Sequence, residues 1–106
     1  MDLSTDWVRI ASTSDVPEGE ARAIEIMGLN LALYHVGDDW FCTDNICTHE
    51  FAMLTDGWLE EHVIECPLHG GQFDIRTGKG LCAPISVDLK IFPVRIDGED
   101  ILITLS

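Results

Sequence analysis

Apolar and polar residues alternate along much of the chain, and this period of two is typical of half-buried β-strands. No segment keeps the period of an amphipathic helix over several turns, so the pattern predicts an all-β fold. With turn residues at its interruptions, the alternation predicts strands at 7–11, 21–27, 29–36, 40–43, 62–65, 89–96 and 101–105.

Short runs rich in glycine and acidic residues mark the turns between these strands. A tight turn is predicted near Gly28, and residues 12–19 are predicted to form a turn or a single helical turn. A second short helical turn is predicted at 51–54. Further hairpin turns are predicted at 37–39, 77–80 and 97–100.

Two cysteine–histidine pairs lie in the middle of the chain. Cys47 is followed two residues later by His49, and Cys66 is followed three residues later by His69. Two cysteines and two histidines can hold a zinc ion, or a 2Fe–2S cluster with histidines on one iron. A zinc finger of the usual kind has its cysteines on a hairpin and its histidines together on a helix. Here each loop supplies one of each, so two similar loops can clamp a two-metal unit from opposite sides.

The residues around both pairs resemble the Rieske family. The first pair reads C-T-H, and 16 residues separate it from C-P-L-H-G-G-Q-F-D, which is followed by T-G and a later proline. The resemblance covers nearly the whole chain, which looks like a stand-alone Rieske-type ferredoxin of a bacterial aromatic-ring dioxygenase system. It implies one Rieske-type 2Fe–2S cluster, with Cys47 and Cys66 on the inner iron and His49 and His69 on the outer one.

The resemblance also implies how the chain is divided. The expected fold is a single Rieske domain over 1–106, with an antiparallel base barrel or sandwich at 1–44 and 86–106. A cluster-binding subdomain would be inserted at about 45–85. A chain of 106 residues has room for one core but not for a substrate-binding domain beside it, so an oxygenase catalytic subunit is excluded.

The expected function is electron transfer rather than catalysis, and no catalytic residue is predicted. By resemblance, single electrons would come from a flavin-containing, NADH-dependent reductase and pass to a terminal Rieske oxygenase. A monomer is expected. Two alternatives stay open: a zinc-binding structural or interaction module, and a Rieske-like accessory subunit of another redox enzyme such as nitrite reductase.

The charge of the chain bears on its partners. Lys and Arg total 6 against 19 Asp and Glu, which gives a net charge of −13. This charge disfavours nucleic acid and anionic membrane and favours partners with basic docking surfaces, although acidity also serves solubility alone. The N-terminus lacks the features of a secretion signal, and no apolar run approaches the roughly 18 residues of a membrane span. A cytoplasmic location is therefore expected, where cysteines more often bind metal than form disulfides.

The remaining cysteines and the tryptophans are predicted to be structural. Cys42 and Cys82 are expected in the core as small apolar residues, and Trp40 and Trp58 are expected there rather than as electron relays.

The roles of the two other histidines and of the residues beside the two pairs are predicted from their sequence neighbours. His35 and His62 have no cysteine at ligand spacing and are expected to be structural or solvated. Glu50 is either solvated or a negative charge beside the outer iron. Apolar residues expected to shield the cluster are Phe51, Leu68 and Pro84.

Overall fold

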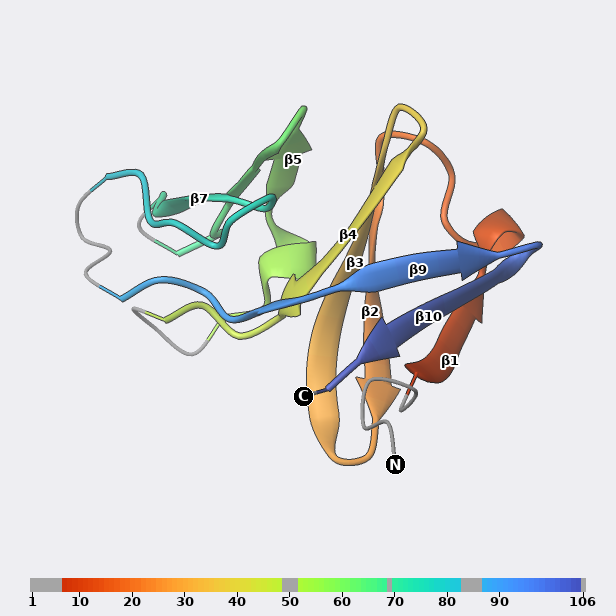
Figure 1. The fold of residues 1–106 in the computed structure, drawn as a ribbon. Helices are drawn as coiled ribbons and strands as arrows, with labels where there is room; N and C mark the ends of the chain where they lie inside the picture. Colours follow the sequence, from red (N-terminus) through yellow and green to blue (C-terminus); the bar gives the residue numbers. More distant parts are fainter. Residues whose placement is uncertain (1–6, 49–51, 69, 83–86, 106) are drawn as a thin grey trace.

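The computed structural model describes residues 7–48, 52–68, 70–82 and 87–105. These residues form ten β-strands and two short 3₁₀-helices and contain no α-helix (Figure 1), as the alternating pattern predicted. The strands are β1 (Trp7–Ser12), β2 (Ala21–Ile26), β3 (Leu29–Val36), β4 (Asp39–Asp44), β5 (Trp58–Glu60), β6 (Val63–Glu65), β7 (Gln72–Asp74), β8 (Ile91–Phe92), β9 (Val94–Asp97) and β10 (Asp100–Thr104). The 3₁₀-helices are η2 (Thr13–Asp15) and η3 (Leu54–Asp56).

The strands pair antiparallel in three sheets. One sheet has the order β1-β10-β9, the second β2-β3-β4-β8 and the third β5-β6-β7. The first two sheets combine strands from both ends of the chain, whereas the third lies wholly within 58–74. Figure 1 shows this third sheet at one side of the molecule, beyond the two larger sheets.

The turn between β2 and β3 follows from two residues. Met27 has φ 51° and Gly28 has φ 77°, which is the left-handed pair that a two-residue hairpin turn requires. The strands then pair without a break from Ile26↔Leu29 to Ala21↔Tyr34. The tight turn predicted near Gly28 is confirmed.

The prediction of a single strand over 89–96 is wrong. Pro93 divides this segment into β8, which pairs with β4, and β9, which pairs with β10. Proline has no N–H to donate to a sheet ladder, so pairing is interrupted at this position. The two strands therefore lie in different sheets, and the segment connects them.

Two other local predictions need correction. The short helical turn expected at 51–54 begins only at Leu54 and forms η3; residue 51 lies outside the described residues. Strands β5 and β7, of three residues each, were not among the predicted strands.

Two cores share the strand β3. Leu31 and Leu33 pack into one cluster with residues of the β1-β10-β9 sheet, while Ala32 and Tyr34 pack into the other. All four side chains are fully buried, because successive residues of a strand point to opposite faces. Within the described residues, no helix has the length and apolar character needed to cross a membrane.

Gly57 allows a test of how the third sheet is held. A Cβ at this position would overlap the carbonyl oxygen of Glu65, the last residue of β6. We expect Gly57→Ala to lower the free energy of unfolding by at least about 2 kcal/mol, because backbone must move to relieve the overlap. The measurement is urea unfolding followed by circular dichroism.

Gly37→Ala is the matched control. Gly37 has φ 61° and open space around its Cα, so alanine there meets backbone strain without a clash. Only Gly57→Ala should also reduce incorporation of the iron cluster that the Rieske resemblance implies, because Glu65 directly precedes Cys66. Equal iron content in the two variants would contradict this prediction.

Candidate metal centre

The two cysteine loops are closed in the same way. The N–H of Cys47 donates to the carbonyl oxygen of Ala52 at 2.9 Å, and that of Cys66 donates to the carbonyl oxygen of Gly71 at 2.7 Å. In both loops the cysteine bonds to the fifth residue after it. Each cysteine therefore lies at the neck of a short loop, and in the sequence the paired histidine falls between the two bonded residues.

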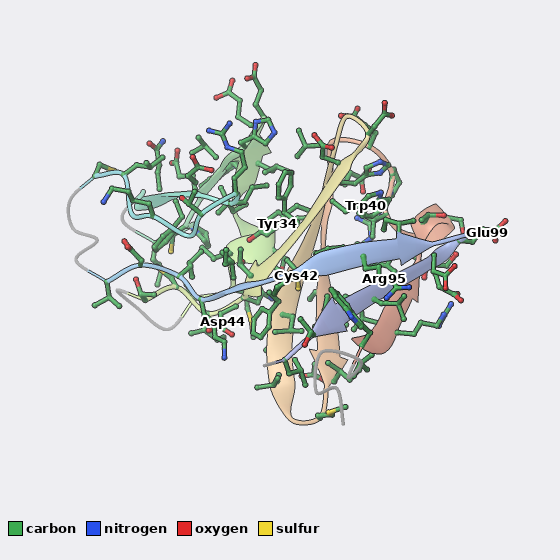
Figure 2. All side chains as sticks on the ribbon, viewed as in Figure 1. Tyr34, Trp40, Cys42, Asp44, Arg95 and Glu99 are labelled. Atoms are coloured by element: carbon green, nitrogen blue, oxygen red, sulfur yellow. The ribbon has the colours of Figure 1, made fainter. Side chains whose placement is uncertain are left out.

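Both cysteines are buried in one core cluster. Cys47 is 4% exposed and Cys66 is 0% exposed, and each packs in the cluster that contains Tyr34 and Phe73. Figure 2 shows Tyr34 among side chains between the third sheet and strand β4. Two sulfur atoms from separate loops thus enter the same water-excluded region, which suits ligands on the inner side of a metal site.

The histidines His49 and His69 lie outside the described residues, and so do Glu50, Phe51 and Pro84. The chain on either side of His69 is described: Leu68 is 44% exposed, and Gly70 has φ 68°. The second loop therefore presents at least one apolar side chain to solvent, and the shielding role expected of Leu68 stays a prediction.

A third segment is tied to the first loop. The Thr48 hydroxyl donates to the carbonyl oxygen of Val87 at 2.7 Å, across 39 positions of sequence. At the base of this segment the N–H of Leu89 donates to the carbonyl oxygen of Gly78 at 2.7 Å. These two bonds hold the segment that follows residue 86 at Val87 and at Leu89; residues 83–86 lie outside the described residues.

A side-chain bond links the two arms of the second loop. Gln72 donates to a carboxylate oxygen of Glu65 at 3.1 Å, between the paired ends of β6 and β7. The other carboxylate oxygen of Glu65 lies 3.6 Å from where a Cβ at Gly70 would stand. A Cβ there would make only an ordinary van der Waals contact, so the positive φ of Gly70, rather than lack of space, favours glycine at this position. Sequence analysis missed the bond between Gln72 and Glu65 because it depends on the register of two strands.

The predictions for the other cysteines and the tryptophans are only partly confirmed. Cys42 is buried at 2% exposure, but Cys82 is exposed, so it is not a core residue. Trp58 is 61% exposed and is likewise not core, because it lies on the edge strand β5. Trp40 is partly buried and packs against the core on the other side of β3.

His35 and His62 have structural surroundings, as predicted. His35 stacks on Trp40 with ring centroids 3.8 Å apart, and its Nδ1–H donates to the carbonyl oxygen of Val16 at 2.8 Å. His62 meets the ring of Phe41 edge-on at 5.5 Å. These contacts give both imidazoles a packing role.

The family described as Rieske [2Fe-2S] domain matches residues 6–93. The chain belongs to the Rieske 2Fe–2S domain family. Its cofactor is a Rieske-type 2Fe–2S cluster.

Individual Rieske proteins are similar over almost the full length. The chain is 42% identical over 104 residues to the naphthalene 1,2-dioxygenase system ferredoxin component of Pseudomonas aeruginosa, covering 98% of this chain and 100% of that protein. The fold is similar to Sphingomonas yanoikuyae B1 ferredoxin, with a TM-score of 0.90, 39% identity, and coverage of 95% of this chain and 100% of that one.

A third Rieske protein was solved together with a partner. Its structure is described as a complex of reduced oxygenase and oxidized ferredoxin in carbazole 1,9a-dioxygenase. The TM-score is 0.86 at 37% identity, with 92% of this chain and 91% of that one covered.

The described residues of this Rieske domain fit a cluster. Rieske centres take two cysteine thiolates on one iron and two histidines on the other. Cys47 and Cys66 supply two buried sulfurs in one core cluster, from loops with the same closure. Gly70 and Gly71 follow the second pair, so no Cβ stands on these two residues beside the loop.

The two remaining thiols should differ in reactivity. Burial, with a smaller contribution from the charge of Asp44, raises the pKa of the Cys42 thiol to about 12, and the reactive species is the thiolate. At pH 8 we expect iodoacetamide to modify exposed Cys82 within minutes and to leave Cys42 unmodified, as measured by peptide mass spectrometry.

Unfolding in guanidinium supplies the control for this experiment, because both thiols should then react. Modification of Cys42 in the native protein at a rate similar to that of Cys82 would contradict the burial of Cys42.

Proposed function

We propose that this protein is an electron-transfer ferredoxin of an aromatic-ring dioxygenase system. The observation that carries the proposal is that two cysteine loops with the same closure place their sulfurs in one core. The relatives that cover the whole chain are ferredoxin components of such systems, which supports it. The proposed role is to carry electrons and not to catalyse a reaction.

The proposed ligands are Cys47 and Cys66 for the inner iron, and His49 and His69 for the outer iron. The cluster supplies one-electron oxidation and reduction when it is bound. The burial of Cys47 and Cys66 supports their inner position, because water is kept from the two sulfurs. Leu68, which is half exposed one residue before His69, supports a histidine side that faces solvent and partners.

The proposed division of the chain follows the sheets. A base at 1–44 and 86–106 would carry a cluster-binding subdomain at about 45–85. The β5-β6-β7 sheet lies wholly within the second segment, which supports this division.

The proposed partners are a flavin-containing, NADH-dependent reductase and a terminal Rieske oxygenase, and the protein is proposed to act as a monomer. The named complex of an oxygenase with a similar ferredoxin supports the oxygenase. A reductase that uses NADH shares its compartment with the electron carrier, which supports a cytoplasmic location for both.

The net negative charge of the protein supports partners with basic docking surfaces. The side chains of Arg9, Arg22 and Arg76 already form ion pairs, with Asp100, Glu20 and Asp74 respectively. The remaining acidic residues greatly outnumber the basic ones. A basic surface on a partner would therefore meet a large excess of uncompensated carboxylates.

The ligand set is tested by replacing its members. We expect Ala at Cys47, His49, Cys66 or His69 to abolish or strongly impair cluster incorporation, because metal binding and local folding are coupled. Purified wild-type protein should be red-brown with a Rieske electron-paramagnetic-resonance signal, whereas a zinc-binding module would be colourless. Cys42→Ser and Cys82→Ser are the controls and should keep the colour.

An unchanged Rieske signal in Cys66→Ala would overturn the ligand assignment. Stoichiometric zinc without iron in the wild-type protein would favour the alternative of a structural zinc module.

Electron transfer is tested by reconstitution with a reductase and an oxygenase of the naphthalene type. We expect NADH-dependent reduction of the cluster to slow several-fold as salt rises from about 0.02 M to 0.5 M, because screening shortens the range of charge steering. Stopped-flow spectrophotometry measures the rate. Rates that do not change with salt would exclude steering, and the absence of any reduction by such reductases would count against the proposed partner.

A further inference from the structure

The two ligand loops close alike, but different structures hold them. The arms of the second loop are the strands β6 and β7, which pair at Val63↔Asp74, Ile64↔Phe73 and Glu65↔Gln72. The arms of the first loop, 45–47 and 52–54, form no such ladder and share only the isolated bridge Ile46↔Met53 among the described residues. Something other than a sheet must keep the first loop in place.

Asn45 lies at the base of these arms and is fully buried. Its carbonyl oxygen accepts from the N–H of Leu54 at 2.7 Å, opposite the bond from Cys47 to Ala52. Its side-chain Oδ1 accepts from the N–H of Thr55 at 2.9 Å, and its Nδ2 donates to the Thr55 hydroxyl at 3.0 Å. Asn45 thus joins the two arms through both its backbone and its side chain.

The same residue joins the loop to the core strand β3. Its N–H donates to the carbonyl oxygen of Asn30 at 2.9 Å, and its Nδ2 donates to Oδ1 of Asn30 at 3.0 Å. The Nδ2 of Asn30 in turn lies 3.3 Å from the sulfur of Met53 in the second arm. The network is therefore closed, and it connects β3 with both arms of the loop.

The orientation of the amide follows from these partners. The N–H of Thr55 can only donate, so the atom that faces it must be the oxygen of Asn45. The NH₂ group then faces Asn30 and the Thr55 hydroxyl, where both of its hydrogens find acceptors. An aspartate would keep the shape but lose both donors, and a leucine would lose the acceptor as well.

We propose that Asn45 is a positioning residue for the cluster, because it holds the first ligand loop as the β6–β7 ladder holds the second. This inference rests on the proposed ligation by Cys47 and His49. It predicts that Asn45 acts on the geometry at the cluster and on the opening of the first loop, beyond any effect on global stability.

The experiment compares holoprotein variants in three measurements: the rate of iron loss to a chelator, the reduction potential, and the g-values of the electron-paramagnetic-resonance spectrum. We expect Asn45→Leu and Asn45→Asp to lose iron at least about tenfold faster than wild type, because a fully buried network of several hydrogen bonds is broken. Their g-values and potential should also shift. Asn30→Ala removes the side-chain acceptor of Asn45 and the amide that contacts Met53, and it should give the same changes at a smaller size, about threefold in rate.

The matched control is Ile103→Ala. Ile103 is fully buried in the core cluster that contains neither Cys47 nor Cys66. Its truncation should lower thermal stability by a similar amount and leave the g-values and the potential as in wild type. Iron loss that simply tracks thermal stability across all four variants, with unchanged g-values, would overturn the proposal.

Two further outcomes are decisive. If the Asn45 variants take up no cluster but keep the wild-type β-sheet spectrum, the proposal is supported, and Asn30→Ala supplies the spectroscopic test. If wild type itself shows no Rieske signal, the proposed ligand set fails, which is distinct from a failure of the role given to Asn45.

Discussion

Both faces of strand β3 are buried, and the arrangement of the other strands depends on this burial. The side chains of Leu31 and Leu33 are buried on one face of the strand, and those of Ala32 and Tyr34 are buried on the other. Burial of each large apolar side chain contributes about 1.5–3 kcal/mol, so covering both faces strongly favours the fold. The buried Tyr34 hydroxyl also has a hydrogen-bond partner. The Thr43 hydroxyl donates its hydrogen to the carbonyl oxygen of Asp44 at 2.7 Å, so it accepts from the Tyr34 hydroxyl at 2.9 Å.

The proposed metal centre lies on one side of that strand. Cys47 and Cys66 belong to the cluster that contains Ala32 and Tyr34, so both sulfurs rest on the same packed layer. Their loops reach this layer by different means: the second through the β6–β7 ladder, the first through the Asn45 network that is anchored on β3. A fold with one central strand that is buried on both faces can therefore place two proposed ligand loops that are separate in the sequence.

Much of this was present in the sequence. Alternation along 21–36 predicted the β2–β3 hairpin, because the period of two is a local property and the turn requires residues that tolerate a positive φ. The two cysteine–histidine pairs predicted the family and its cofactor, because ligand type and spacing are also local. Strongly local signals were read correctly for this reason.

Other features were decided only by the tertiary structure. Pro93 interrupts a strand, but the change from one sheet to the other at this point depends on which strands lie nearby, β4 before the proline and β10 after it. Trp58 and Cys82 have apolar side chains and were assigned to the core, yet an edge strand and a loop leave them exposed. Asn45 looks like an ordinary turn residue, and its role in the network comes from Asn30 and Thr55, which lie 15 and 10 positions away. Local spacing predicted which residues are proposed to bind the cluster, because ligand type and spacing are local. Long-range packing and hydrogen bonding decided which residues contact the two proposed ligand loops, because these contacts join positions far apart in the sequence.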